Sequence, residues 1–432
     1  MIKKIGKYEA IRELGKGATS VVYEAIDPFV NRHVAIKVVF ADALGDKEHG
    51  KRYRKLFLTE ASLAGKLAHP HIVNIYDAVA DDDASYIVME YVDGTTLEHH
   101  SRAEHLLPIN KVIEIVFKCT KALDYAAKHG VIHRDIKPAN IMLSGENDIK
   151  ITDFGAAMTA STETTQITGI GSPAYMSPEQ VKELPLTYQT DIFSLGVVLF
   201  QMLTGRLPFQ ATNNYGMIYQ IINTEAPPPS SLRTDVPPQL DAIVKRAMQK
   251  NTTDRYQTWE EFSRDLVAVF GTLQKPEKSI PDSEKFDVLR KLAFFKNFAD
   301  VELWEALRIS IWDKHGPEHA LIREGDIGKS FFILASGEVK VTKQGKLLNL
   351  LRVGDCFGEM TYLGNKQFQR TASVISSTDI TVIEIRAESL EKASDLCRHH
   401  FNGAFLEMLV DRLSMANTRL SQLLAANNIS VF

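Results

Sequence analysis

The sequence predicts a multidomain α+β protein in which a strand-rich part, a helical part and a second strand-rich part follow one another. Three observations support this prediction. β-branched residues alternate or cluster within residues 8–95, which is typical of strands. Apolar residues recur mostly at helical spacing in residues 110–270. Residues 319–385 contain short β-type runs separated by Gly-Asp and Ser-Gly turns, which indicates a barrel or jelly roll.

The first strand-rich part should open with three strands and one helix. The strands are expected at residues 8–14, 21–26 and 33–39, where β-branched side chains occur together. The helix is expected at residues 53–67, where leucines return to one face. This order predicts a small sheet-rich lobe followed by a larger helical lobe.

The domain boundaries follow from a change in composition. Residues 271–285 are polar, hold two prolines and show no periodicity, so they read as a linker. The first domain is therefore expected at residues 8–270, with lobes at 8–92 and 93–270. The second domain is expected at residues 286–425. Two to four domains of roughly 100–200 residues each are what a chain of 432 residues allows.

The second domain should begin and end with helices. Its opening helical segments are expected to reach about Trp312, before the β-type runs begin. Residues 388–425 return to helical spacing. Their apolar residues recur on one face: Leu406, Val410, Leu413, Leu420 and Leu424. This helix could serve as a lid, as a contact to the first domain or as a homodimer seam, and packing on the barrel is the simplest alternative.

Composition excludes several classes of protein. Hydrophobic residues make up 44% and charged residues 24%, as in folded globular proteins. A net charge of −4 argues against nucleic acid and anionic membrane as partners. Cys119, Cys356 and Cys397 are too few and too scattered for a disulfide framework or a zinc site, so a cytoplasmic location is expected. The start lacks a signal peptide's apolar segment, and no membrane span is expected, because residues 192–203 read as a buried helix.

Two short motifs supply the groups that phosphoryl transfer needs. These are a base for the attacking hydroxyl, oxygen ligands for Mg²⁺ and a cation near the moving phosphate. Residues 133–140 read His-Arg-Asp-Ile-Lys-Pro-Ala-Asn, and residues 153–155 read Asp-Phe-Gly. Both resemble the catalytic loop and metal-binding motif of the protein-kinase superfamily. The resemblance implies Asp135 as the catalytic base and Lys137 as the cation. It implies Asn140 and Asp153 as the Mg²⁺ ligands.

The same resemblance places ATP in the first lobe. Residues 14–22 form a glycine-rich stretch between two expected strands, with Ser20 where the family has its third glycine. Lys37 would hold the phosphates, and Glu60 would position Lys37. Backbone groups of Glu90 and Val92 would bond the adenine, with Met89 as gatekeeper. The implied ATP contacts are Leu14, Gly15, Lys16, Gly17, Ala18, Thr19, Ser20, Val22, Ala35, Lys37, Glu90, Val92 and Met142.

The segment from Asp153 to Glu179 resembles the kinase activation segment. Within it, residues 159–168 hold six hydroxyl residues in ten. We expect autophosphorylation at Thr164, Thr165 or Thr168, because Arg134 is the cation that a phosphate could contact. A polar loop that needs no phosphate is the alternative.

Two further contacts are expected to support the active site. Glu179 would pair with Arg255, and Asp191 would accept hydrogen bonds from the backbone of the catalytic loop. Lys137 and Ser172 match serine/threonine rather than tyrosine kinases, and the overall resemblance is to bacterial kinases.

A second constellation lies in the other domain. Phe-Gly-Glu-Met at 357–360, followed by Arg-Thr-Ala-Ser-Val at 370–374, resembles the phosphate-binding cassette of cyclic-nucleotide-binding domains. Arg370 would bind the cyclic phosphate as a planar fork, and Glu359 would accept the ribose hydroxyl. The implied contacts are Gly358, Glu359, Met360, Arg370 and Thr371. Eleven positions separate Glu359 from Arg370, which is slightly long for this family.

These resemblances imply a bilobal protein-kinase fold followed by a cyclic-nucleotide-binding β-roll with flanking helices. The expected function is transfer of the ATP γ-phosphate to Ser/Thr hydroxyls of protein substrates, with Mg²⁺ as cofactor and cAMP or cGMP as regulator. One alternative is an active kinase whose second domain is a docking or scaffold module without a ligand. A transcription factor is disfavoured, because nothing after Arg370 resembles a helix-turn-helix.

Overall fold

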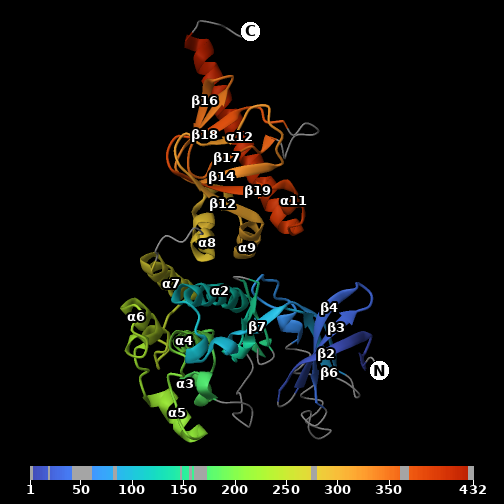
Figure 1. Ribbon diagram of the computed structural model, residues 1–432, viewed down its shortest axis with the longest axis vertical. Coiled ribbons are helices and arrows are strands. Elements are labelled where there is room, and N and C mark those ends of the chain that lie inside the picture. Colours follow the sequence, from blue (N-terminus) through green and yellow to red (C-terminus); the bar gives the residue numbers. More distant parts are fainter. Residues whose placement is uncertain are drawn as a thin grey trace. The chain divides into compact units, whose positions relative to one another are not determined.

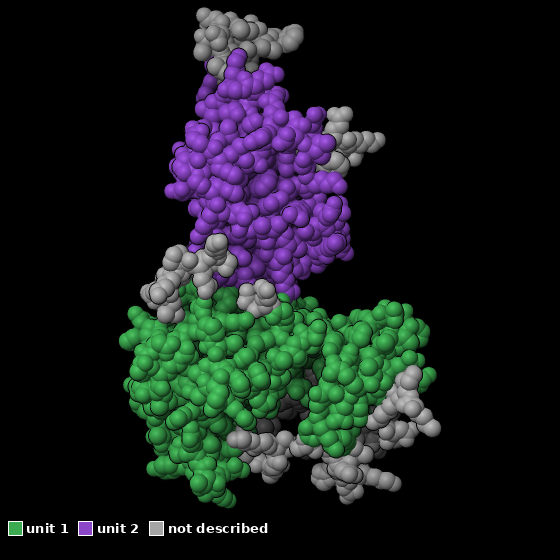
Figure 2. All heavy atoms as spheres, viewed as in Figure 1, with its two compact units in different colours: residues 1–276 green, residues 277–432 purple. Residues whose placement is uncertain are grey.

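The computed structural model describes residues 3–17, 20–40, 61–80, 85–145, 148–154, 158–159, 173–273, 280–360 and 369–426 (Figure 1). The chain forms two compact units, Met1–Pro276 and Glu277–Phe432 (Figure 2). Each unit has its own sheets and its own buried core.

The first lobe of unit 1 is an antiparallel six-stranded sheet in the order β1-β2-β3-β4-β6-β5. Its strands are β1 Lys3–Ile5, β2 Tyr8–Lys16, β3 Ser20–Asp27, β4 Arg32–Val39, β5 Ile75–Ala80 and β6 Ser85–Glu90. The three strands predicted from sequence are confirmed as β2, β3 and β4. One face buries a cluster around Tyr8, Ile36 and Val88, while Ala61 packs near Val39 and Ile87 in another cluster.

The second lobe is mainly helical. Its helices are α2 Ile109–Lys128, α3 Pro178–Val181, α4 Gln189–Thr204, α5 Asn214–Asn223, α6 Pro238–Ala247 and α7 Trp259–Leu273. Short strands β7 Gly94–Thr96, β9 Ile141–Ser144 and β10 Asp148–Ile151 form a small sheet, and β8 Val131–Ile132 pairs with β11 Met158–Thr159. Figure 1 shows these helices on the side of unit 1 away from β2–β4.

Helix α4 is the centre of the helical lobe. Every residue from Thr190 to Thr204 is buried, which confirms the buried helix predicted for residues 192–203. Gly196 lets α6 approach closely, because a Cβ there would lie 2.8 Å from the Cβ of Ala247. The lobe is therefore packed around an apolar helix that fixes the loops at its N-terminal end.

Unit 2 is a β-roll of two antiparallel four-stranded sheets, in the orders β12-β19-β14-β17 and β13-β18-β15-β16. The strands are β12 Ser310–His315, β13 Ala320–Ile322, β14 Ser330–Ser336, β15 Val339–Lys343, β16 Lys346–Leu351, β17 Cys356–Phe357, β18 Ser373–Ser376 and β19 Ile380–Arg386. Apolar residues from both sheets form one core, including Leu334, Val339 and Val374. Helices α8 Asp282–Lys291 and α9 Asp300–Ile309 precede the roll, and α11 Ala387–Glu391 and α12 Asp395–Ala426 follow it.

The structure corrects two boundaries expected from sequence. Helix α9 ends at Ile309, and Trp312 lies in β12, which pairs with β19 about 70 positions later. Local spacing could not show that distant strand partner. Helix α7 continues to Leu273 and α8 begins at Asp282, so helical residues occupy both ends of the stretch 271–285 that was expected to be a linker.

Helix α12 has one attached face and one exposed face. Phe401 and Phe405 are buried and contact the rings of Phe294 and Phe331. Three residues of the expected apolar face instead point to solvent, with exposed fractions of 65%, 58% and 63% for Leu406, Val410 and Leu413. Packing on the roll therefore does not explain that face. None of the helices in the described part of the chain is both long and apolar enough to cross a membrane.

Candidate active site and second pocket

The loop after β8 brings three predicted catalytic residues together. The Nζ of Lys137 donates to Oδ2 of Asp135 over 2.7 Å. The amide nitrogen of Asn140 donates to the same oxygen over 3.0 Å and to the backbone carbonyl of Asp135 over 2.8 Å. The Asp135 side chain is 43% exposed, so a substrate hydroxyl could reach it. Two donors thus orient an accessible carboxylate, as a general base requires.

Lys37 and Asp153 form a second part of the same site. Lys37 comes from β4 and Asp153 follows β10, yet Nζ lies 2.6 Å from Oδ1 across 116 positions of sequence. Asp153 has a φ of +59°, a conformation that costs energy for a non-glycine residue. Glu60, the expected partner of Lys37, lies outside the described residues.

The oxygens of Asn140 and Asp153 suit Mg²⁺, which prefers carboxylate and amide oxygens over nitrogen or sulfur ligands. The amide nitrogen of Asn140 is held by Asp135, so this contact fixes the orientation of the side-chain amide. Among the described residues there is no cluster of three or more His, Cys, Asp or Glu that could hold a metal. The carboxylate of Asp153 and the amide oxygen of Asn140 are hard donors of the kind that would hold Mg²⁺.

Helix α4 supports the catalytic loop as the sequence predicted. Its Asp191 accepts backbone N–H bonds from His133 and Arg134, each 2.8 Å long. Burial raises the pKa of Asp191, while these bonds and the charges of His133 and Arg134 oppose the rise. The backbone of Arg134 has a φ of +67°, and the two bonds to Asp191 hold it there.

The predicted pair of Glu179 and Arg255 is also present. Arg255 donates from Nη1 to Oε1 over 2.8 Å and from Nη2 to Oε2 over 3.1 Å. Burial opposes ionisation of Glu179, but the hydrogen bonds and charge of Arg255 outweigh it and lower the pKa of Glu179. A bidentate pair of this kind fixes geometry as well as charge. It anchors α3, the end of the expected activation segment, to the connection between α6 and α7.

The residues expected around ATP line up across the first sheet. In the strand ladders Gly15 lies opposite Val22, and Val22 lies opposite Lys37. Ala35 lies opposite Met89, the expected gatekeeper. The N–H of Glu90 donates to the carbonyl of Asn74 over 2.8 Å, so this N–H is not available to hydrogen-bond adenine.

Other expected ATP contacts have mixed outcomes. Leu14 is 39% exposed at the end of β2, and Lys16 ends the same strand. The N–H of Gly17 donates to the carbonyl of Ser20 over 2.8 Å and closes the turn. Val92 is buried after β6, and Met142 lies on β9. The described part of the chain does not include Ala18, Thr19, Thr164, Thr165, Thr168 and Ser172.

In unit 2, Arg370 is buried with an exposed fraction of 7%. Its Nη1 donates to the carbonyl of Gly358 over 3.0 Å, and its Nη2 to the carbonyl of Ser330 over 2.7 Å. A Cβ on Gly328 or Gly358 would lie 2.4 Å or 2.6 Å from the guanidinium. Two glycines therefore make the space that this side chain fills.

Three nearby carboxylates partly offset the cost of burying the charge of Arg370. Burial lowers the pKa of its guanidinium, and Glu384, Glu359 and Asp326 act in the opposite sense. A guanidinium has five N–H donors in a fixed fork, so it suits an anion such as a cyclic phosphate. Gly358 has a φ of +78°, and Met360, two positions later, is helical. These features fit the expected cassette.

Helix α12 contributes one residue that the sequence analysis missed. Arg412 donates from Nη1 to Oε1 of Glu359 over 2.8 Å, and from Nη2 to the carbonyl of Cys356. Glu359 is only 5% exposed, so this buried carboxylate is paired with a residue 53 positions away. The sequence offered one signal for this contact. Arg412 lies seven positions, or about two helical turns, after Phe405 and so on the attached face of the helix.

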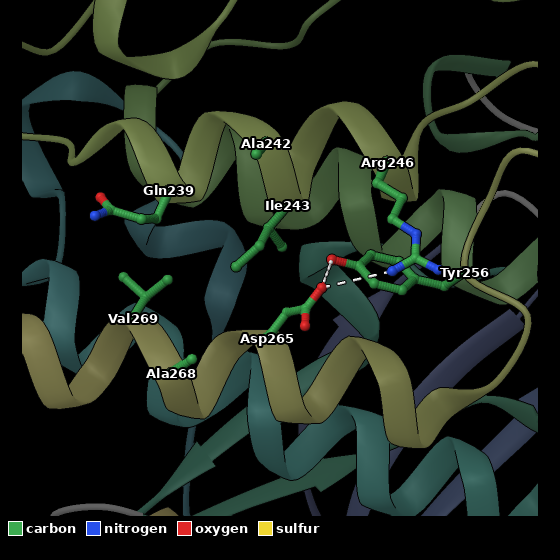
Figure 3. Close-up of a pocket in the computed structure, with 8 residues that line it drawn as sticks. All are labelled: Gln239, Ala242, Ile243, Arg246, Tyr256, Asp265, Ala268 and Val269. Carbon is green, nitrogen blue, oxygen red and sulfur yellow. Dashed lines mark hydrogen bonds and ion pairs between the residues drawn. The ribbon is translucent and has the colours of Figure 1, made fainter.

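A separate hollow of about 310 Å³ lies between α6 and α7 (Figure 3). Its floor is mainly apolar, with Ala242, Ile243 and Val269. At one end Tyr256 donates to Asp265 over 3.0 Å, and the guanidinium of Arg246 lies 4.2 Å from the Tyr256 ring. It contains none of the expected site residues, so we do not assign the chemistry to it.

Comparisons with known proteins agree with this geometry. The family model for a protein kinase domain matches residues 8–266, and that for a cyclic nucleotide-binding domain matches residues 314–395. A probable serine/threonine-protein kinase of Clostridium acetobutylicum is 40% identical over 61% of this chain and 40% of its own length.

Two further relatives are similar over about two thirds of this chain. Serine/threonine-protein kinase PknB of Mycolicibacterium smegmatis is 38% identical over 66% of this chain and 46% of its own length. Serine/threonine-protein kinase PrkC of Bacillus subtilis is 35% identical over 68% of this chain and 45% of its own length. This chain spans less than half the length of these curated relatives.

The kinase model covers more than half of the 432 residues, and the residues in its range include the paired Lys37 and Asp153 and the cluster around Asp135. The chain therefore belongs to the protein kinase family, and it carries a cyclic nucleotide-binding domain after its kinase domain.

Proposed function

We propose that the protein transfers the γ-phosphate of ATP to Ser and Thr hydroxyls of protein substrates. The observation that carries this proposal is the cluster in which Lys137 and Asn140 both bond the carboxylate of Asp135. Asp135 would accept the proton of the attacking hydroxyl, and Lys137 would stabilise charge on the moving phosphate. Asn140 and Asp153 would hold Mg²⁺, which would neutralise charge on the phosphates of ATP. A lysine at position 137 matches the pattern of serine/threonine kinases, and the relatives are named as serine/threonine-protein kinases.

The test is Asp135→Asn, which removes the base and keeps the size of the side chain. We expect phosphate transfer to a generic protein substrate to fall by about 10²–10⁴-fold, the usual contribution of a general base. ATP binding, measured by calorimetry, should stay close to that of the wild type. The control is Asp235→Asn, because Asp235 is 62% exposed and lies outside the site. Unchanged transfer by Asp135→Asn would overturn the assignment.

We further propose that a cyclic nucleotide regulates the kinase by binding to unit 2. Support comes from the buried guanidinium of Arg370 between two glycines and from the neighbouring carboxylate of Glu359. Arg370 would bind the cyclic phosphate, and Gly358, Met360 and Thr371 would complete the cassette. cAMP and cGMP are both compatible with Thr371, which is exposed. A ligand shifts activity only if it binds two arrangements of the protein with different affinities.

The test is the initial rate of phosphate transfer by the full chain, titrated with cAMP and with cGMP. A saturable change that disappears in Arg370→Ala and persists in Arg352→Ala would support regulation, since Arg352 is 77% exposed in the same unit. A typical coupling of about 1–3 kcal/mol corresponds to a change of roughly 5–150-fold. A rate that ignores both nucleotides would favour a docking module.

Three further expectations stay proposals. Autophosphorylation at Thr164, Thr165 or Thr168 would place a phosphate near Arg134. The domain limits of 8–270 and 286–425 stay expectations from sequence composition, and helices α7 and α8 each extend a few residues into the stretch between them. A cytoplasmic location suits the three cysteines, which are all free and buried.

A further inference from the structure

Three segments of unit 1 meet at Glu90. They are the end of β6, which carries Met89 and Glu90, the loop of residues 69–74 and the strand β10. The N–H of Glu90 donates to the carbonyl of Asn74 over 2.8 Å. Within the same loop, the N–H of Val73 donates to the carbonyl of Ile151 over 3.0 Å, and the N–H of Ile151 donates to the carbonyl of His71 over 2.8 Å. The loop therefore joins the base-binding strand to the strand that leads to Asp153.

Side chains close this junction around the carboxylate of Glu90. Its Oε2 accepts from the backbone N–H of Asn74 over 3.2 Å and from the Asn74 amide over 3.0 Å. The same oxygen lies 2.8 Å from Nζ of Lys150, which comes from β10. Lys150 also donates to the carbonyl of Ile72 over 3.3 Å. One ammonium group thus contacts both the end of β6, called here the hinge strand, and the connecting loop.

The pair is largely shielded from water. The side chain of Lys150 is 12% exposed and that of Glu90 is 23% exposed. A charge left without its partner in such a place is costly, so loss of Lys150 should displace Glu90 rather than leave it in position. Because the backbone of Glu90 is part of the expected adenine site, a displaced side chain would move the groups that face the base.

We propose that Lys150 is a positioning residue for ATP, acting through Glu90. It fixes the hinge strand relative to β10, whose chain continues within three residues to the Mg²⁺ ligand Asp153. The adenine end and the phosphate end of the nucleotide site are therefore held in register by one ion pair. This inference rests on the proposed use of ATP as phosphate donor. It adds a residue that contacts neither the nucleotide nor the acceptor.

The experiment compares Lys150→Met, Lys150→Arg and the control Lys128→Met in the full chain. Lys128 pairs with Asp124 and its side chain is 67% exposed. For Lys150→Met we expect KM for ATP and the calorimetric Kd for ATP to rise about 5–30-fold, with kcat and KM for the protein substrate within about twofold. Lys150→Arg should recover most of the affinity, and Lys128→Met should behave as the wild type.

A double-mutant cycle separates positioning from a general loss of structure. Glu90→Gln keeps an acceptor for Asn74 and removes the charge that Lys150 pairs with. If the two residues act as a unit, the double variant should bind ATP no more weakly than either single variant. Fully additive losses would overturn the proposal, as would an unchanged Kd in Lys150→Met. Equal falls in kcat and protein-substrate affinity without recovery by Lys150→Arg would also overturn it.

The calorimetric measurement keeps this test separate from the proposed function. ATP binding is read without turnover, so a wild-type chain that binds ATP but transfers no phosphate would refute the activity alone. The comparison of Kd between variants would still decide the role of Lys150.

Discussion

At the scale of single residues, Arg412 joins the last helix to the expected nucleotide pocket. Its partner Glu359 is 5% exposed, while the side chain of Arg412 is 28% exposed. A buried carboxylate loses its hydration, so it needs the hydrogen bond that Arg412 donates. The same arginine bonds the carbonyl of Cys356. The contact therefore stabilises both a strand end and a helix.

Replacing Arg412 by methionine should destabilise unit 2 by about 1–3 kcal/mol, because it leaves the Glu359 carboxylate buried without this donor. Adding Glu359→Gln should recover part of the loss, since a neutral amide costs less to bury than a charge. Urea unfolding followed by tryptophan fluorescence measures both changes. A double variant less stable than Arg412→Met would contradict the explanation.

Lys250 offers a residue-scale test of pH dependence. Its Nζ donates to the carbonyl of Ile221 over 2.7 Å, near the C-terminal end of α5, and lies 4.2 Å from the Phe209 ring. Burial, together with the charge of Arg255, lowers the pKa of Lys250 from 10.5 to about 8. Between these two values the unfolded chain binds more protons than the folded chain. Stability due to this group therefore rises with pH through that window.

Lys250→Met should remove this component of the pH dependence. The difference in unfolding free energy between wild type and variant should change between pH 7 and pH 9.5, in favour of the wild type at the higher pH. The matched control is Lys128→Met, which changes an exposed lysine. A parallel pH profile for wild type and Lys250→Met would show that the amine titrates as in solution.

At the scale of elements, the two units use glycine in different ways. Gly196 lies inside α4, where a Cβ would meet Ala247 at 2.8 Å and Met248 at 3.0 Å. Gly403 lies inside α12, where a Cβ would meet nothing within 4 Å. The first glycine is required by the close approach of α4 and α6, whereas the second only lowers helix propensity.

Gly196→Ala should destabilise unit 1 by about 1–3 kcal/mol, since added volume in a packed interface forces the helices apart. Gly403→Ala should stabilise unit 2 by about 0.5–1 kcal/mol through helix propensity alone. Thermal unfolding by calorimetry resolves the two effects on their own transitions. Equal effects of the two substitutions would mean that packing between α4 and α6 does not decide the first.

At the scale of the whole molecule, the exposed face of α12 has no partner among the described residues. Leu406, Val410 and Leu413 follow one another at intervals of four and three, and Asn417 continues the series. That spacing is typical of a two-stranded coiled coil, where one asparagine sets the register. We propose that a second copy of the chain covers this face, which is the homodimer seam among the alternatives that the sequence left open.

The full chain should then have twice its mass of 48.4 kDa in light scattering. Replacing both Val410 and Leu413 by glutamate should give monomers, because charges would be buried in the seam. The double variant Glu407→Gln with Ser414→Ala, on the flanks of the seam, should remain dimeric. A monomeric wild type would contradict the proposal.

The sequence by itself predicted the residues of the candidate site and determined the order of the two domains. The motif of the catalytic loop lies within eight positions, and its resemblance to the protein kinases gave Asp135, Lys137 and Asn140 their expected roles. Strands β2 to β4 and helix α4 were also predictable, because period and apolar content are local properties. The same holds for Asp191 and Glu179, whose roles came with the family resemblance.

Only the tertiary structure revealed the distant contacts that no family motif implied. Arg412 reaches Glu359 across 53 positions, and Lys150 reaches Glu90 across 60. Strand β12 exists because β19 lies beside it, and the apolar face of α12 is exposed because Phe401 and Phe405 turn the other face inward. Such contacts depend on how elements pack in space, and no local period in the chain encodes that packing.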